Sequence, residues 1–175
     1  NGKTRCLHTP AQAKAAGIEM IYQELSLVPQ VSIAENIFAG RLPSSNRFLV
    51  NRRQLIEESR HWLAKVGLDC APLMRVEQIS PHEAQRVEIA KALSNRPTIL
   101  VMDEPTSSLS RREVEILFGL IRDLKSQGLA IIYISHHLPE VFAVADRCTV
   151  LRDGRRIATR PIANFSPDSL VEMMV

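Results

Sequence analysis

Paired carboxylates, Asp103 and Glu104, follow an apolar run in the middle of the chain. The run, residues 98–102, has the length and composition of a buried strand, so both acids would stand at its carboxyl end. Such a pair suits nucleotide hydrolysis, because the first carboxylate can hold Mg²⁺ while the second orients or activates the attacking water. Two solvated acids at a strand end are the alternative, and the Pro-Thr-Ser-Ser-Leu-Ser turn that follows counts against it.

Two further polar side chains stand in the same kind of place. Gln23 follows the apolar residues 18–22, and His136 follows the apolar residues 129–134. Gln23 could reach both Mg²⁺ and water, and His136 could bond a γ-phosphate and hold the catalytic glutamate and its water in register. A loop glutamine is usually a surface residue and a lone histidine is usually structural. The prediction of a site therefore rests on the fact that polar side chains follow all three expected strands.

Strand and helix signals alternate along the chain. Strands are expected at 18–22, 98–102 and 129–134. Helices are expected at 9–17, 32–40, 51–67, 80–95, 110–128 and from 166. A polar connection is expected at 41–50 and a hairpin with an Asp-Gly turn at 148–159. Buried strands that alternate with helices favour an α/β fold with a mostly parallel sheet flanked by helices. Parallel sheets place their chemistry at the carboxyl ends of the strands, where Gln23, Asp103 and His136 would lie.

The composition narrows the class of protein. A chain of 175 residues is long enough for a domain with a real core, and its 45% apolar and 5% aromatic residues favour an aliphatic-rich α/β or α protein over a β-sandwich. The net charge of +3 permits contact with phosphates or anionic surfaces. No apolar run approaches the roughly 18–20 residues that span a bilayer. The three cysteines lack metal-type spacing and indicate a reducing compartment.

Taken together, these residues resemble the ATP-binding cassette (ABC) ATPases, along the whole chain. Gln23 looks like part of the Q-loop, residues 100–105 like Walker B with its catalytic glutamate, Ser107 and Ser108 like the D-loop, and His136 like the switch histidine. The resemblance implies a P-loop NTPase-like core with a helical subdomain insertion. It also implies ATP and Mg²⁺ as ligands, with Glu104 and His136 catalytic, Asp103 and Gln23 on the metal, and Ser80, Ser107 and Ser108 near the nucleotide.

The likeness is greatest to the first cassette of the sugar-importer ATPases of the ribose, galactoside and xylose class. Residues 16–25, 34–38, 87–93, 133–136, 151–154 and 169–175 carry it. In that family one polypeptide holds two cassettes and drives a membrane permease fed by a periplasmic sugar-binding protein. The resemblance therefore implies permease subunits and a second cassette as partners, no nucleic acid, and a place at the cytoplasmic face of the inner membrane.

The sequence contains no Gly-x-x-x-x-Gly-Lys-Ser/Thr loop, whose backbone amides and lysine would cradle the β- and γ-phosphates. Residues 1–4, Asn-Gly-Lys-Thr, better resemble the family's Gly-Lys turn after the Walker A helix. We therefore expect a partial cassette that begins after the phosphate loop, binds ATP negligibly alone, and is marginally stable or dimerises because a central sheet element is missing. Residues 24–95 would form the helical and signature subdomain, and 1–23 and 96–175 parts of the catalytic core.

Residues 79–83, Ile-Ser-Pro-His-Glu, stand where the family's signature usually reads Leu-Ser-Gly-Gly-Gln. A helix N-terminus attracts anions through its free N–H groups. Ser80 is kept, but Pro81 removes one donor, His82 adds bulk and Glu83 adds negative charge. Ser80 and Glu83 also form a Ser-x-x-Glu capping box. We expect the stretch to cap its helix well and bind phosphate poorly, so that one of two composite ATP sites is weak.

Other functions stay open at this stage. A non-transport ABC ATPase acting in DNA repair or on ribosomes would usually carry coiled coils or basic insertions, and none is seen. A non-catalytic interaction module is compatible with the missing phosphate loop. A helicase with an Asp-Glu box lacks any accompanying nucleic-acid motif. The leading prediction is the ATP-hydrolysing, energy-coupling part of a bacterial carbohydrate importer.

Overall fold

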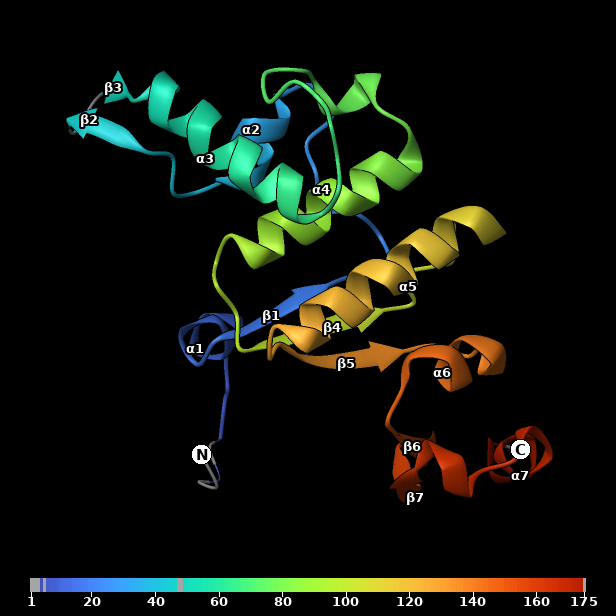
Figure 1. The fold of residues 1–175 in the computed structure, drawn as a ribbon. Helices are drawn as coiled ribbons and strands as arrows, with labels where there is room; N and C mark the ends of the chain where they lie inside the picture. The colour runs from blue at the N-terminus through green and yellow to red at the C-terminus, as the bar shows by residue number, and fades with distance from the viewer. Residues whose placement is uncertain (1–3, 5, 47–48, 175) are drawn as a thin grey trace. The chain divides into compact units, whose positions relative to one another are not determined.

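The computed structural model describes residues 4, 6–46 and 49–174 and divides into two compact units, Asn1–Ile132 and Tyr133–Val175 (Figure 1). Residues 1–3 of the Asn-Gly-Lys-Thr turn lie outside the described residues, as does Val175. None of the described helices is both long enough and apolar enough to cross a bilayer.

A small sheet with the strand order β1-β4-β5 forms the base of the first unit. Its strands are β1 (Ile18–Ile21), β4 (Ile99–Asp103) and β5 (Ala130–Ile134). β1 and β4 are parallel, with Ile18 opposite Ile99 and Ile21 opposite Met102, and the side chains of Ile21 and Met102 are fully buried. This pairing confirms the predicted α/β class with parallel strands.

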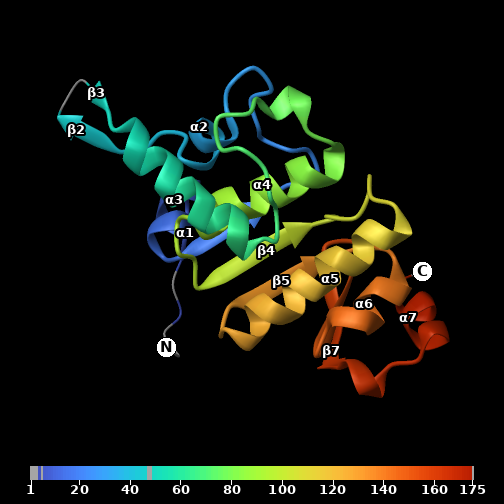
Figure 2. The same ribbon diagram turned by 45° about the horizontal axis from the view of Figure 1, so that its top comes forward.

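The helices of the first unit begin where the sequence places their N-caps. They are α1 (Pro10–Ala15), α2 (Ile33–Ile37), α3 (Arg52–Lys65), α4 (Pro81–Leu93) and α5 (Arg111–Ser126), preceded by Thr9, Ser32, Asn51, Ser80 and Ser110. α4 and α5 lie along the same face of β1 and β4 (Figures 1 and 2). α2, α3 and α4 pack on one another, and each contributes buried apolar side chains: Ile33, Ile37, Leu55, Leu63, Val87 and Ile89.

Gly17 fixes the approach of α1 to β4. Its φ is +81°, and a Cβ at this position would lie 2.8 Å from Oγ1 of Thr98. The Gly17 carbonyl accepts the backbone N–H of Thr98 at 2.8 Å. Glycine is therefore required both for the left-handed backbone and for this close contact, which sets the register between β1 and β4.

Two features of the strands differ from what the sequence predicts. Residues 41–50, expected to be a polar connection, also contain the antiparallel strands β2 (Ser44–Asn46) and β3 (Leu49–Val50). These strands span only three and two residues, which is too short to leave an alternating pattern. β5, expected to be buried, exposes Ile132 to 51% and Ile134 to 43%. Among the described residues β5 has a neighbouring strand on one side only, so its apolar side chains are not covered as those of β4 are.

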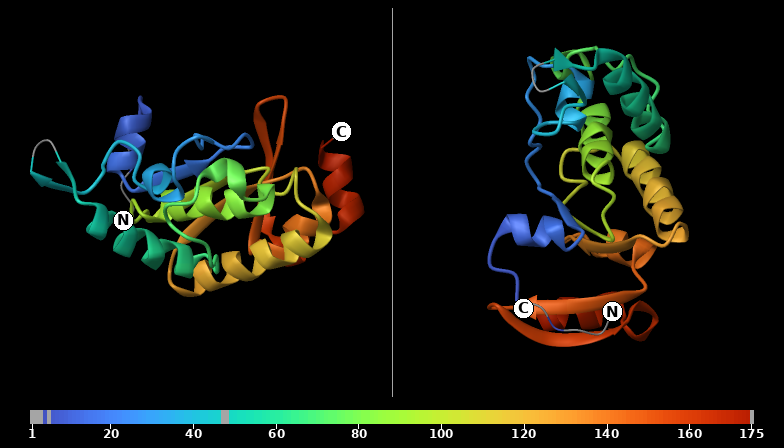
Figure 3. Two further views of the ribbon diagram at one scale, coloured as in Figure 1. Left: turned by 90° about the horizontal axis from the view of Figure 1, so that it is seen from above. Right: turned by 90° about the vertical axis from the view of Figure 1, so that its left-hand side faces the viewer.

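The second unit consists of a hairpin and short helices. They are α6 (Leu138–Val144), β6 (Arg147–Arg152), β7 (Arg155–Pro161), the 3₁₀ turn η2 (Ile162–Asn164) and α7 (Pro167–Met174). The other 3₁₀ turn, η1 (Val76–Gln78), belongs to the first unit and precedes α4. β6 and β7 are antiparallel, and the right-hand view of Figure 3 shows them as a pair of orange strands. Asp153 and Gly154 connect them with φ of +50° and +71°, as a two-residue type I′ turn requires. The predicted Asp-Gly hairpin is confirmed.

Candidate functional site

The parallel register of β1 and β4 brings three of the predicted site residues to one edge of the sheet. Ile21 lies opposite Met102, so the carboxyl ends of β1 and β4 lie next to each other. Asp103 is the last residue of β4 and Glu104 follows it, while Gln23 lies two residues beyond the end of β1. Gln23 is exposed, and the two acids are half-buried. The edge therefore presents an amide oxygen and two carboxylates from two neighbouring strands.

This donor set fits Mg²⁺. The ion prefers oxygen ligands, and in phosphate sites it takes one or two protein ligands and completes its shell with water and phosphate oxygens. Asp103 offers a carboxylate and Gln23 an amide oxygen at the same edge. Within the described part of the chain, no group of three or more His, Cys, Asp or Glu side chains is arranged to hold a metal ion by itself.

Glu104 has an unusual backbone. Its φ of +44° lies in the left-handed region, which residues other than glycine, asparagine and aspartate rarely adopt. The Glu104 carbonyl accepts the N–H of Ser107 at 3.2 Å, and the intervening Pro105 and Thr106 are buried, so the turn is held in place. A conformation of this kind costs on the order of 1–3 kcal/mol and is concentrated at functional sites. Ser107 and Ser108 are exposed on the same turn.

At the start of α4, Ser80 and Glu83 form the predicted capping box. The backbone N–H of Ser80 donates to Oε2 of Glu83 at 2.8 Å, and its hydroxyl donates to the same oxygen at 2.6 Å. These hydrogen bonds hold the pKa of Glu83 below its ordinary value, and the bond from the hydroxyl contributes the most. The Glu83 carboxylate therefore occupies both the N–H and the hydroxyl donor of Ser80.

His82 joins the starts of two helices, which the sequence did not predict. Its Nδ1 lies 2.8 Å from Oε1 of Glu113 and 2.9 Å from Oγ of Ser80. Glu113 also accepts the backbone N–H of Ser110 at 2.6 Å, which is the capping contact of α5. His82 thus bridges the capping boxes of α4 and α5. No local pattern in the sequence indicates this pair, because the two residues are distant in the chain and meet only through helix packing.

Replacing Glu83 by Gln is expected to weaken the dependence of stability on acid. A carboxylate whose pKa is lower in the folded than in the unfolded chain stabilises the fold above its unfolded pKa, and this stabilisation is lost as pH falls through the folded pKa. The urea midpoint of E83Q should therefore fall less than that of the wild type between about pH 7 and about pH 3.5. The control variant carries Gln in place of the exposed Glu24. If acid lowered the urea midpoint of E83Q as much as that of the wild type, the prediction would be contradicted.

His136 lies in the second unit, immediately after β5, and is exposed. Its ring stacks at a tilt on His137, with centroids 4.2 Å apart. The neighbouring Ser135 accepts the N–H of His137 at 3.0 Å and donates to Oε2 of Glu140 at 3.1 Å, which also accepts from Tyr133 at 2.7 Å. Glu140 thus stabilises the loop that carries His136 through these hydrogen bonds. Of the predicted residues, Gln23, Asp103 and Glu104 share one sheet edge, Ser80 lies at the start of α4, and His136 is described within its own unit.

Comparisons with known proteins agree with this architecture. A family model described as ABC transporter matches residues 3–107. The ribose import ATP-binding protein RbsA 3 of Rubrobacter xylanophilus is 48% identical over 96% of the chain and 34% of the relative. The xylose import ATP-binding protein XylG of Moorella thermoacetica is 46% identical over 100% of the chain and 34% of the relative. The chain thus spans about a third of the length of these curated relatives.

Solved structures share the fold. A dimeric ATP-binding cassette in a post-hydrolysis state bound to ADP and Pi matches with a TM-score of 0.72 and 22% identity, over 91% of this chain and 69% of that one. A nucleotide-free ATP-binding cassette from an ABC transporter matches with a TM-score of 0.78 and 23% identity, over 95% and 71% of the two chains. At this level of identity the likeness concerns the fold alone.

Proposed function

Because the chain belongs to the ABC transporter family, we propose that it is part of an ATP-hydrolysing subunit that powers the import of a sugar. The observation that carries the proposal is the parallel register of β1 and β4, which gathers Gln23, Asp103 and Glu104 at one edge. The names of the relatives supply the substrate class, since the similar proteins are ribose and xylose import ATP-binding proteins.

Each residue at the edge has a distinct role in the proposed reaction. Asp103 and Gln23 would hold a magnesium ion, directly or through water, and Glu104 would orient and activate the water that attacks the γ-phosphate. A bound Mg²⁺ supplies charge neutralisation on the β- and γ-phosphate oxygens. Ser107 and Ser108 face the nucleotide from the turn after β4, and His136 donates to the γ-phosphate.

The proposed assembly has further members. Permease subunits receive the energy of hydrolysis, a periplasmic binding protein delivers the sugar, and a second cassette completes each ATP site at the cytoplasmic face of the inner membrane. Ser80 would face the ATP of that second cassette. Because Glu83 already occupies the Ser80 donors, the site that α4 completes is the weaker of the pair.

Replacing Asp103 by Asn is expected to raise the Mg²⁺ concentration required for half-maximal ATP hydrolysis by about tenfold or more. Asparagine keeps the size of the side chain but removes the negative charge that attracts the ion. The measurement is phosphate release from ATP at increasing Mg²⁺, made on the full gene product that carries this chain. Asn in place of Asp123, exposed on α5, is the matched control and should leave the magnesium requirement unchanged.

The function itself is tested by phosphate release from Mg²⁺–ATP in membranes that hold the gene product, its permease and a sugar-binding protein. The proposal expects hydrolysis that the sugar stimulates and that requires the permease. Hydrolysis indifferent to permease and sugar would point instead to a non-transport ATPase. Absence of any hydrolysis would leave an interaction module as the alternative.

A further inference from the structure

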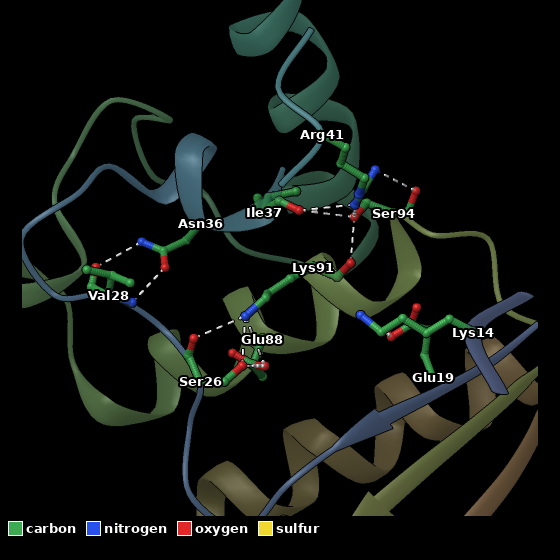
Figure 4. A network of polar contacts seen from close by, with 10 residues as sticks. All are labelled: Lys14, Glu19, Ser26, Val28, Asn36, Ile37, Arg41, Glu88, Lys91 and Ser94. Carbon is green, nitrogen blue, oxygen red and sulfur yellow. Dashed lines mark hydrogen bonds and ion pairs between the residues drawn. The ribbon is translucent and has the colours of Figure 1, made fainter. Parts of the chain in front are cut away.

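Two side-chain clamps hold the irregular segment that follows Gln23 (Figure 4). In the first, Glu88 on α4 accepts the hydroxyl of Ser26 at Oε1, with Oγ and Oε1 2.6 Å apart. Lys91, one turn further along α4, donates to Oγ and to the carbonyl oxygen of Ser26 at 2.7 and 3.1 Å. Its Nζ also lies 3.5 Å from Oε1 of Glu88. Ser26 is therefore fixed to α4 through both its side chain and its backbone.

The second clamp lies two residues further on. Asn36 on α2 is 2% exposed, and its side chain pairs with the backbone of Val28. The N–H of Val28 donates to Oδ1 of Asn36 at 2.7 Å, and Nδ2 of Asn36 donates to the carbonyl of Val28 at 3.0 Å. The segment thus has two fixed points, Ser26 on α4 and Val28 on α2. Gln23 lies three residues before the first of them.

Glu88 does not have the features of a group that serves stability alone. It is 5% exposed, and within the described part of the chain its Oε2 is buried and accepts no hydrogen bond. A buried carboxylate oxygen without a donor carries a desolvation cost that no hydrogen bond offsets. The hydrogen bond that the other oxygen of Glu88 accepts holds the segment adjoining Gln23.

We propose that Glu88 is a positioning residue for Gln23: through Ser26 and Lys91 it fixes the segment after Gln23 to α4 and so sets the place of the Gln23 amide at the carboxyl edge of β1. The link also ties this amide to the helix that begins at Ser80. The consequence for hydrolysis rests on the proposed function, whereas the ordering of the segment does not.

The first test measures how well the segment after Gln23 is ordered. In the full gene product, Glu88→Met should speed amide hydrogen exchange at Val28 and Val31 by about tenfold or more, because the Ser26 anchor is lost. The melting temperature should fall modestly, because Lys91 loses its carboxylate partner. Met in place of Glu115, exposed on α5, is the control. Unchanged exchange at both amides in Glu88→Met would overturn the proposal.

The second test measures the effect of Glu88 on Gln23 through the kinetics of ATP hydrolysis. Glu88→Met should lower kcat by about tenfold with an unchanged KM for ATP, and Glu88→Gln, which keeps an acceptor for Ser26, should restore most of the rate. In a Gln23→Ala background Glu88→Met should have no further effect, whereas independent, multiplying effects would overturn the proposal. If the wild type releases no phosphate at all, the proposed function fails, and the exchange measurement alone decides whether Glu88 orders the segment.

Discussion

Replacing Glu104 by Gln in the full gene product is expected to lower ATP turnover by about 10²–10⁴-fold and to leave ATP binding intact. The amide has the size of the carboxylate and preserves the turn, but it cannot accept a proton from water. Phosphate release measures turnover, and calorimetric titration measures binding. Gln in place of the exposed Glu115 is the matched control. Undiminished phosphate release by E104Q would remove Glu104 from the catalytic role.

A second substitution separates backbone strain from chemistry at the same position. Glycine adopts a φ of +44° without penalty. Glu104→Gly should therefore remove the backbone strain at this position, while its turnover stays as low as that of E104Q. A glycine variant that is both active and more stable would mean that position 104 serves only the turn.

The largest effect on stability is expected from Ile21→Ala, a loss of about 2–5 kcal/mol in the free energy of unfolding. The Ile21 side chain is fully buried where β1 lies against Met102 of β4, so truncation leaves a cavity directly beneath the edge that carries the site. Urea unfolding followed by the fluorescence of Trp62, the single tryptophan, measures the first unit.

Ile132→Ala on β5 provides the control for this prediction. The residue is 51% exposed, so removing its side chain should change the free energy of unfolding by about 1 kcal/mol or less. Equal losses in the two variants would contradict the description of β1 and β4 as the core of the sheet. The Ile21 variant should also require more Mg²⁺ for hydrolysis, since the chain leading to Gln23 rests on this side chain.

Much of the fold is predictable because the responsible signals are local. Ser32 with Glu35 and Ser110 with Glu113 define helix starts by their spacing, and the structure contains both capping boxes. Asp153-Gly154 defines a hairpin because both residues tolerate the left-handed backbone. The edge of the site is predictable for a related reason: polar residues at the ends of apolar strands meet when the strands are parallel.

Contacts that depend on packing between elements were not predictable. His82 with Glu113 and Ser26 with Glu88 join residues that are distant in the chain, and their pairing follows from how α4 meets α5 and the segment after β1. The exposure of Ile132 was missed for the same reason. An apolar run predicts a strand, but whether neighbouring elements cover that strand depends on the tertiary structure.

The position of Mg²⁺ in a Mg²⁺–ATP complex of the E104Q gene product tests the central claim most directly. In the proposed mechanism the ion would lie at the carboxyl edge of β1 and β4, and Oε1 of Gln23 and a carboxylate oxygen of Asp103 would hold it directly or through one water. The amide of residue 104 should face the γ-phosphate. An ion bound elsewhere, with Gln23 and Asp103 turned to solvent, would contradict it.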